Sequence, residues 1–275
     1  MLGVFFVATR GDSNAAAAVI NKWVAEKTND KIKEIVSEGD IDSLTRLILV
    51  NAIYFKGDWL TKFDINGTRD DDFHISANES VKVKMMNMKS KFFYGVSSEL
   101  NAQAIELPYA GESLSMVILL PDRATTLSQL EEKLTSDDLA FVKEKFSMSL
   151  QEVSLFLPRF SLDEQLGLDK VLKDMGMRDL FSGGAADLSG IDGSKELYVS
   201  RVLHHAVVEV NEEGTEAAAA TAVVFMLRSL GGPKENIFRA NRPFLFFIQD
   251  KATKSILFLG RLVKPPAAAT AKGEL

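Results

Sequence analysis

The sequence predicts a single α+β domain. Three observations lead to this fold class: apolar stripes with helical spacing, apolar runs typical of buried strands, and a chain without an internal repeat or a linker. At 275 residues the chain could hold one large domain or two ordinary ones. Its 46% hydrophobic content is enough for a substantial core.

The N-terminal part predicts a helix followed by a strand. An apolar stripe of Val19, Ile20, Trp23 and Val24 follows a candidate helix cap at Asp12 or Ser13. The run Leu47–Phe55 is almost entirely apolar and rich in branched and aromatic residues. This composition is expected of a strand that is covered on both faces.

The rest of the chain predicts a hairpin, two helices and a C-terminal pair of strands. In chain order these are strands over Ile105–Leu107 and Ser115–Leu120, helices over Thr126–Phe146 and Leu166–Met175, and strands over Phe244–Ile248 and Ile256–Val263. Tyr109-Ala110-Gly111 predicts the hairpin turn, and Gly176 ends the second helix. The segment Asp250–Lys254 predicts the last turn.

Composition argues against several classes of function. The net charge of −6 and a pI near 5.3 disfavour nucleic acid as the main partner, because binding to a phosphate backbone needs clustered Lys and Arg. No apolar run approaches the roughly 18 residues of a membrane span. The absence of cysteine excludes disulfides, a catalytic thiol and thiolate metal sites. We expect no metal and no cofactor.

The segment Glu212–Ser229 combines features of a mobile loop and of a buried strand. Gly214 supplies a hinge, because a residue without a Cβ tolerates backbone angles forbidden to others. From there alternate positions are small or β-branched and uncharged, as one smooth strand face requires: Thr215, Ala217, Ala219, Thr221 and Val223. An Ala-rich helix is an equally good interpretation of the composition alone.

This segment resembles the reactive-centre loop of the serpins. The hinge pattern of that family appears in Glu212, Glu213, Gly214, Thr215, Glu216, Ala217, Ala218, Ala219, Ala220 and Thr221. Counting onward by the family's spacing places the scissile bond between Arg228 and Ser229. The resemblance is not confined to this segment. Five segments of the chain are similar to serpin signature segments and occur in the family's order: Ile20–Val36, Thr45–Phe63, Leu203–Ala220, Asn236–Ile248 and Ser255–Pro265.

The resemblance implies the serpin fold, with a large mixed main sheet, smaller sheets and helices, and a mobile reactive-centre loop. It also implies that N-terminal helices and some strands of the family are missing from this chain. We interpret residues 1–275 as a single partial serpin domain, with an unmatched leader over 1–14, a serpin-like part over 15–266 and a tail over 267–275.

The function implied is suicide inhibition of a serine protease, not enzymatic activity. The protease attacks the carbonyl of Arg228 and forms an acyl-enzyme, and the cleaved loop enters the main sheet between the strand at Leu47–Phe55 and the strand at His204–Val210. Arg228 suits the acidic S1 pocket of trypsin-like proteases. The alternative is a non-inhibitory binding or folding-assistance protein, or an inactive truncated isoform.

Residues that control opening of the sheet are carried over from the family. Asn51 and His204 match positions at the centre of the sheet, where they hydrogen-bond across the gap that opens. Trp59 and Glu212 match positions near its top. His205 departs from the basic residue expected there.

Localisation is expected to be secreted or in the endoplasmic reticulum, although no signal peptide is evident. Asn66 and Asn78 begin glycosylation sequons, which matter only on the secretory route. The last residues, Lys272, Gly273, Glu274 and Leu275, resemble the Lys-Asp-Glu-Leu retrieval signal with Gly in place of Asp, which implies a retrieval receptor as a partner. A short solvated tail explains them equally well.

Overall fold

A computed structural model describes residues 13–37, 39–42, 44–213 and 235–265. The described residues divide into two compact units, which we treat separately. The first unit draws on Met1–Lys56 and Ser161–Glu209, and the second on Gly57–Phe160 and Val210–Leu275. Both units contain helices and sheet, so the predicted α+β class is confirmed.

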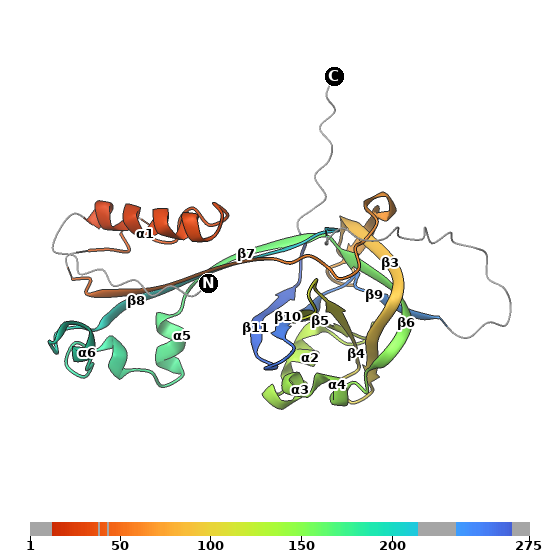
Figure 1. Cartoon of the computed structure of the whole chain (residues 1–275). Coiled ribbons are helices and arrows are strands. Elements are labelled where there is room, and N and C mark those ends of the chain that lie inside the picture. Colours follow the sequence, from red (N-terminus) through yellow and green to blue (C-terminus); the bar gives the residue numbers. More distant parts are fainter. Residues whose placement is uncertain (1–12, 38, 43, 214–234, 266–275) are drawn as a thin grey trace, which may run out of the picture. The chain divides into compact units, whose positions relative to one another are not determined.

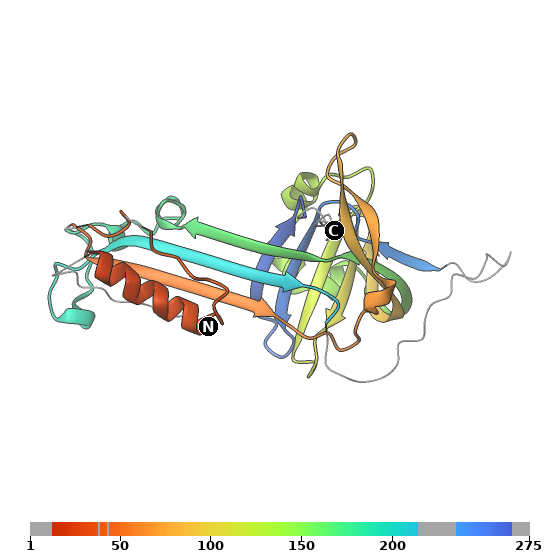
Figure 2. The same ribbon diagram turned by 90° about the horizontal axis from the view of Figure 1, so that it is seen from above.

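The first unit is built on a three-stranded sheet. The order is β1 (Leu47–Lys56), β8 (Val199–Val210) and β7 (Phe160–Gly167). Strands β1 and β8 are hydrogen-bonded directly to each other and run parallel, whereas the arrow of β7 points the opposite way (Figure 2). The apolar run predicted as a buried strand is therefore β1, one residue longer than expected.

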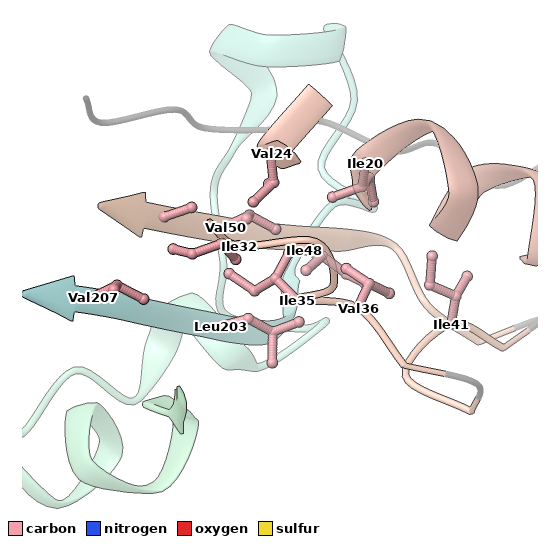
Figure 3. Close-up of a cluster of buried hydrophobic side chains, with 11 residues drawn as sticks. Ile20, Val24, Ile32, Ile35, Val36, Ile41, Ile48, Val50, Leu203 and Val207 are labelled. Carbon is pink, nitrogen blue, oxygen red and sulfur yellow. The ribbon is translucent and has the colours of Figure 1, made fainter. Parts of the chain in front are cut away.

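Helix α1 (Ser13–Lys27) packs on one face of this sheet (Figure 1). Its buried residues Ile20 and Val24 lie against Ile48 and Val50 of β1, as Figure 3 shows. The predicted stripe is correct for these two residues but wrong for Val19, which is 65% exposed. Candidate cap Asp12 lies outside the described residues.

The opposite face of the sheet contacts short helices. These are α5 (Asp169–Asp174), η2 (Asp179–Phe181) and α6 (Ser189–Asp192), with the loops between them. Apolar side chains from this region, including Leu172, Leu180 and Leu188, pack on a buried cluster that contains Val199 and Val202 of β8. The predicted helix over Leu166–Met175 starts later than expected, because Leu166 still belongs to β7.

The second unit contains an eight-stranded sheet. Its strand order is β11 (Ile256–Leu262), β10 (Phe244–Asp250), β5 (Leu114–Pro121), β4 (Ala102–Pro108), β3 (Ser80–Ser97), β6 (Ser149–Pro158) and β9 (Asn236–Arg239), with β2 (Arg69–His74) paired to β3. The predicted hairpin is β4–β5, and the predicted C-terminal pair is β10–β11. A short 3-10 turn, η1 (Ile65–Gly67), precedes β2.

The helix predicted over Thr126–Phe146 is instead three short helices. They are α2 (Leu127–Lys133), α3 (Ser136–Ala140) and α4 (Val142–Lys145). Thr135 interrupts the helical path because its extended backbone and side chain cap α3. Leu130, Val142 and Phe146 nevertheless share one buried cluster with β4 and β5, which explains the helical spacing of the whole segment.

Candidate functional site

The last residues described before the predicted loop are held by a buried carboxylate. The side chain of Glu212 is 5% exposed, and each oxygen has its own donor. Thr68 Oγ1 donates to Oε1 at 2.7 Å, while Arg159 Nε and Nη2 donate to Oε2 at 3.0 and 2.6 Å. A buried carboxylate needs such partners, because its desolvation is costly when it is unpaired.

Trp59 holds the same stretch of backbone from another side. Its indole Nε1 donates to the carbonyl of Asn211 at 2.8 Å, and its backbone N–H donates to the carbonyl of Glu213 at 3.4 Å. The ring is buried and stacks on Tyr109, with centroids 4.5 Å apart and planes 10° apart. We call Trp59, Thr68, Arg159, Asn211 and Glu212 the loop-base cluster.

Three separate elements bring the loop-base cluster together. Arg159 lies between β6 and β7, where its backbone N–H donates to the carbonyl of Lys84 in β3. Thr68 ends the η1 turn, and its own N–H donates to Ile65. Trp59 follows β1 and forms an isolated bridge with Tyr109 after β4. The cluster therefore stands on the sheet of the second unit.

The chain is fixed again just after the predicted loop. Glu235 accepts a hydrogen bond from Ser154 Oγ at 2.6 Å, and Lys89 lies 3.6 Å from its carboxylate. Asn236 opens β9, which runs parallel to β6, and its side chain donates to Gln151 Oε1 at 3.0 Å. Residues 214–234 thus join two fixed points on one unit.

Most predicted hinge residues and the predicted scissile bond lie outside the described residues. These are Gly214, Thr215, Ala217, Ala218, Ala219, Ala220, Thr221, Arg228 and Ser229. Of the predicted hinge, the structure describes Glu212 and Glu213. Both residues follow the end of β8 at Val210 and directly precede Gly214 in the sequence.

The predicted pair Asn51 and His204 meets at the boundary between β1 and β8. The two residues are direct register partners in the parallel pair. Asn51 Oδ1 and His204 Nδ1 are both buried, and neither has a hydrogen-bond partner among the residues that the structure describes. Burial lowers the pKa of His204, and the neighbouring His205 lowers it further.

His205 has a partner that sequence reasoning missed. Its Nε2 lies 2.6 Å from Asp163 Oδ1 on β7, and the residue is 9% exposed. His205 therefore links β8 to β7, on the side of β8 away from β1. Nothing near either residue in the sequence indicates this pair, because 42 positions separate them.

The two sequons lie at the surface. Asn66 is exposed in η1, and Asn78 is exposed in the turn between β2 and β3. In the first sequon the hydroxyl of Thr68 is the donor to Glu212. Within the described ranges, no group of three or more His, Cys, Asp or Glu residues is placed to hold a metal ion. None of the described helices has the length and apolar character that crossing a membrane requires.

Comparison with known proteins places these features in a family. The family described as Serpin (serine protease inhibitor) matches residues 4–265. Leukocyte elastase inhibitor from Bos taurus is 48% identical over 254 residues, which cover 91% of this chain and 67% of the relative. Leukocyte elastase inhibitor from Homo sapiens is 46% identical over 257 residues, covering 92% and 67%.

Solved structures agree with this match. Uncleaved ovalbumin superposes with a TM-score of 0.81 and 34% identity, covering 92% of this chain and 63% of that one. A tumour-suppressing serpin superposes with a TM-score of 0.83 and 27% identity, covering 94% and 67%. The chain thus spans about two thirds of the length of these relatives.

Replacement of Glu212 tests the loop-base cluster. We expect Glu212→Gln to lower the free energy of unfolding by about 1–3 kcal/mol, because the charge-assisted bonds from Arg159 weaken. Urea denaturation measures this change. The matched control is Glu213→Gln, since the adjacent residue is exposed and should shift stability by less than about 0.5 kcal/mol. Equal effects of the two substitutions would contradict the assignment.

The lowered pKa of His204 predicts a loss of stability in acid. A histidine whose pKa in the folded protein lies below its ordinary value of 6.5 stabilises the fold above that value. This contribution disappears as the pH falls below 6.5, because the unfolded chain then binds the proton more readily. We expect His204→Gln to flatten the pH dependence of the unfolding free energy between pH 7 and 5. A pH dependence as steep in His204→Gln as in the unsubstituted chain would contradict this prediction.

Proposed function

The chain belongs to the serpin family, and on that basis we propose that it inhibits a serine protease through residues 214–234. The observation that carries this proposal is the loop-base cluster, which fixes the chain directly before the predicted hinge at Gly214. A substrate loop that presents one peptide bond to a protease needs two fixed ends. The cluster and the Glu235–Asn236 contacts supply them.

The first step of the proposed reaction is ordinary acyl transfer. The serine hydroxyl of the protease attacks the carbonyl carbon of Arg228, and an ester bond forms between them. The peptide bond to Ser229 breaks, and the new amino group of Ser229 takes up the proton from the histidine of the protease. The inhibitor itself contributes no catalytic group, so it is not an enzyme.

In the second step the cleaved segment enters the sheet of the first unit. The direct pairing of β1 with β8 supports this step, because it is the pairing of a sheet that holds no loop strand. About a dozen new backbone hydrogen bonds at roughly 1 kcal/mol each give a driving force on the order of 10 kcal/mol. The small side chains at Ala217 and Ala219 permit entry, whereas a charged residue would be buried unpaired.

Arg228 favours a trypsin-like target within this proposal. A guanidinium fits an S1 pocket with an acidic floor, whereas elastase has a small S1 pocket that a long cation does not fit. The names of the relatives favour a second candidate, an elastase-type protease. The loop offers such a protease the smaller apolar residues Val223 and Val224, several positions before Arg228.

Localisation in the secretory pathway also remains a proposal. It rests on the resemblance of Lys272, Gly273, Glu274 and Leu275 to a retrieval signal, and these residues lie outside the described ranges. Exposure of Asn66 and Asn78 is compatible with glycan attachment on that route. A shift in electrophoretic mobility on enzymatic deglycosylation of the protein from cells would support it, and the absence of a shift would argue against glycosylation.

Cleavage mapping tests the choice of target. Trypsin should cut the loop between Arg228 and Ser229, so mass spectrometry should find Ser229 at the N-terminus of the released C-terminal fragment. Arg228→Glu should abolish this cut, because an acidic side chain would meet an acidic pocket. The matched control is Arg69→Glu, which changes an exposed arginine elsewhere in the same unit. Faster cutting by elastase after Val223 or Val224 would favour the second candidate instead.

Loop insertion is tested by thermal unfolding before and after cleavage. A driving force on the order of 10 kcal/mol should raise the unfolding midpoint by at least about 10 °C. The control variant Ala217→Glu should be cleaved equally well but show no rise, because a buried unpaired carboxylate opposes insertion. If cleavage leaves the midpoint of the chain with Ala217 unchanged, the result would contradict inhibition by insertion and favour a non-inhibitory protein.

A further inference from the structure

The boundary between β1 and β8 is bridged by a lysine that belongs to neither strand. Lys31 lies in the segment between α1 and β1, and its Nζ donates to Glu209 Oε1 on β8 at 2.6 Å. The same ammonium lies over the ring of Tyr54 on β1, 5.6 Å from the centroid. One cation therefore contacts both strands.

The two strand residues also contact each other. The hydroxyl of Tyr54 donates to Glu209 Oε2 at 3.4 Å. In the parallel register Tyr54 opposes Val207 and Lys56 opposes Glu209, so the contact runs diagonally across the boundary. Tyr54 and Val207 belong to the face that packs on α1, on which Lys31 also lies. We call Lys31, Tyr54 and Glu209 the latch.

The backbone beside Lys31 is fixed, so the lysine is presented in one place. Thr28 Oγ1 donates to the carbonyl of Val24 in α1 and accepts from the N–H of Ile32 at 3.1 Å. Ile32 is fully buried in the cluster between α1 and the sheet, as Figure 3 shows. Through these contacts, the segment that holds Lys31 is fixed to α1, and Lys31 itself binds Glu209 on β8.

The two donors of the latch, Lys31 and Tyr54, both have raised pKa values. The hydrogen bond to Glu209 raises the pKa of Lys31 above its ordinary value. Burial raises the pKa of Tyr54, and the charge of Glu209 raises it further. The ammonium and the phenol therefore both keep their protons at neutral pH, and Glu209 accepts from both.

We propose that Lys31 is a positioning residue that slows separation of β1 from β8, and thereby sets the rate at which a strand enters between them. The inference rests on the proposed function, since it concerns the same insertion step. A strand that enters at this level must move Tyr54 away from Glu209, and the latch must break before the new hydrogen bonds form. Exposed ion pairs contribute little individually, so the expected effect on the rate is a moderate one, about 2- to 5-fold.

The experiment measures uptake of a labelled synthetic peptide with the sequence of residues 215–228 by the full 275-residue chain. Lys31→Met keeps the aliphatic stem and removes the charge, and it should raise the uptake rate about 2- to 5-fold. Glu209→Gln should do the same. Lys31→Arg, which retains a donor cation, should keep the rate near that of the unmodified chain. The matched control is Lys33→Met, an exposed lysine on the same segment, which should change nothing.

Salt dependence separates a latch from general destabilisation. Uptake by the unmodified chain should accelerate as ionic strength screens the ion pair, and this acceleration should be lost in Lys31→Met. Equal rates and equal salt dependence in the unmodified chain and in Lys31→Met would overturn the latch while leaving insertion intact. Failure of every variant and of the unmodified chain to take up the peptide would overturn the latch and the proposed insertion together.

Discussion

The buried carboxylate of Glu212 is the interaction on which the candidate site depends. Its two oxygens are held by Thr68 and Arg159, which lie near the two ends of the second unit's first segment, Gly57–Phe160. A carboxylate excluded from water is stable only while both donors stay in place, so the residue fixes its own position and that of the backbone around it. Glu212 thereby fixes the backbone that directly precedes Gly214.

The elements that sequence could predict are those with a local signal. Apolar runs identified β1 and β10, because β10 is buried over its first five residues and β1 has its buried residues towards its N-terminal end. Strand β3, the longest in the described part of the chain, went unpredicted even though Val81, Val83 and Met85 alternate with lysines in its first half. The helical spacing of 126–146 was genuine, but Thr135 caps a new helix within it, and capping overrides periodicity.

In the candidate site, too, some residues were predicted from the sequence and their partners were not. The family resemblance singled out Glu212, Trp59, Asn51 and His204, and in the structure Asn51 opposes His204 across the β1–β8 pair while the Trp59 indole donates to the residue before Glu212. It did not identify Arg159, Thr68 or Asp163 as partners. These contacts span 53, 144 and 42 positions, and each depends on pairing between strands that no local pattern records.

The parallel direction of β1 and β8 has a consequence for chain topology. A segment that leaves the end of β8 and turns back between the two strands runs antiparallel to both of them. One parallel ladder is then exchanged for two antiparallel ladders, whose hydrogen bonds are straighter and slightly more stable per residue. Had β1 run the other way, the returning strand would gain only one such neighbour. Because β1 and β8 are parallel, a third strand that returns from the end of β8 can pair antiparallel with both of them.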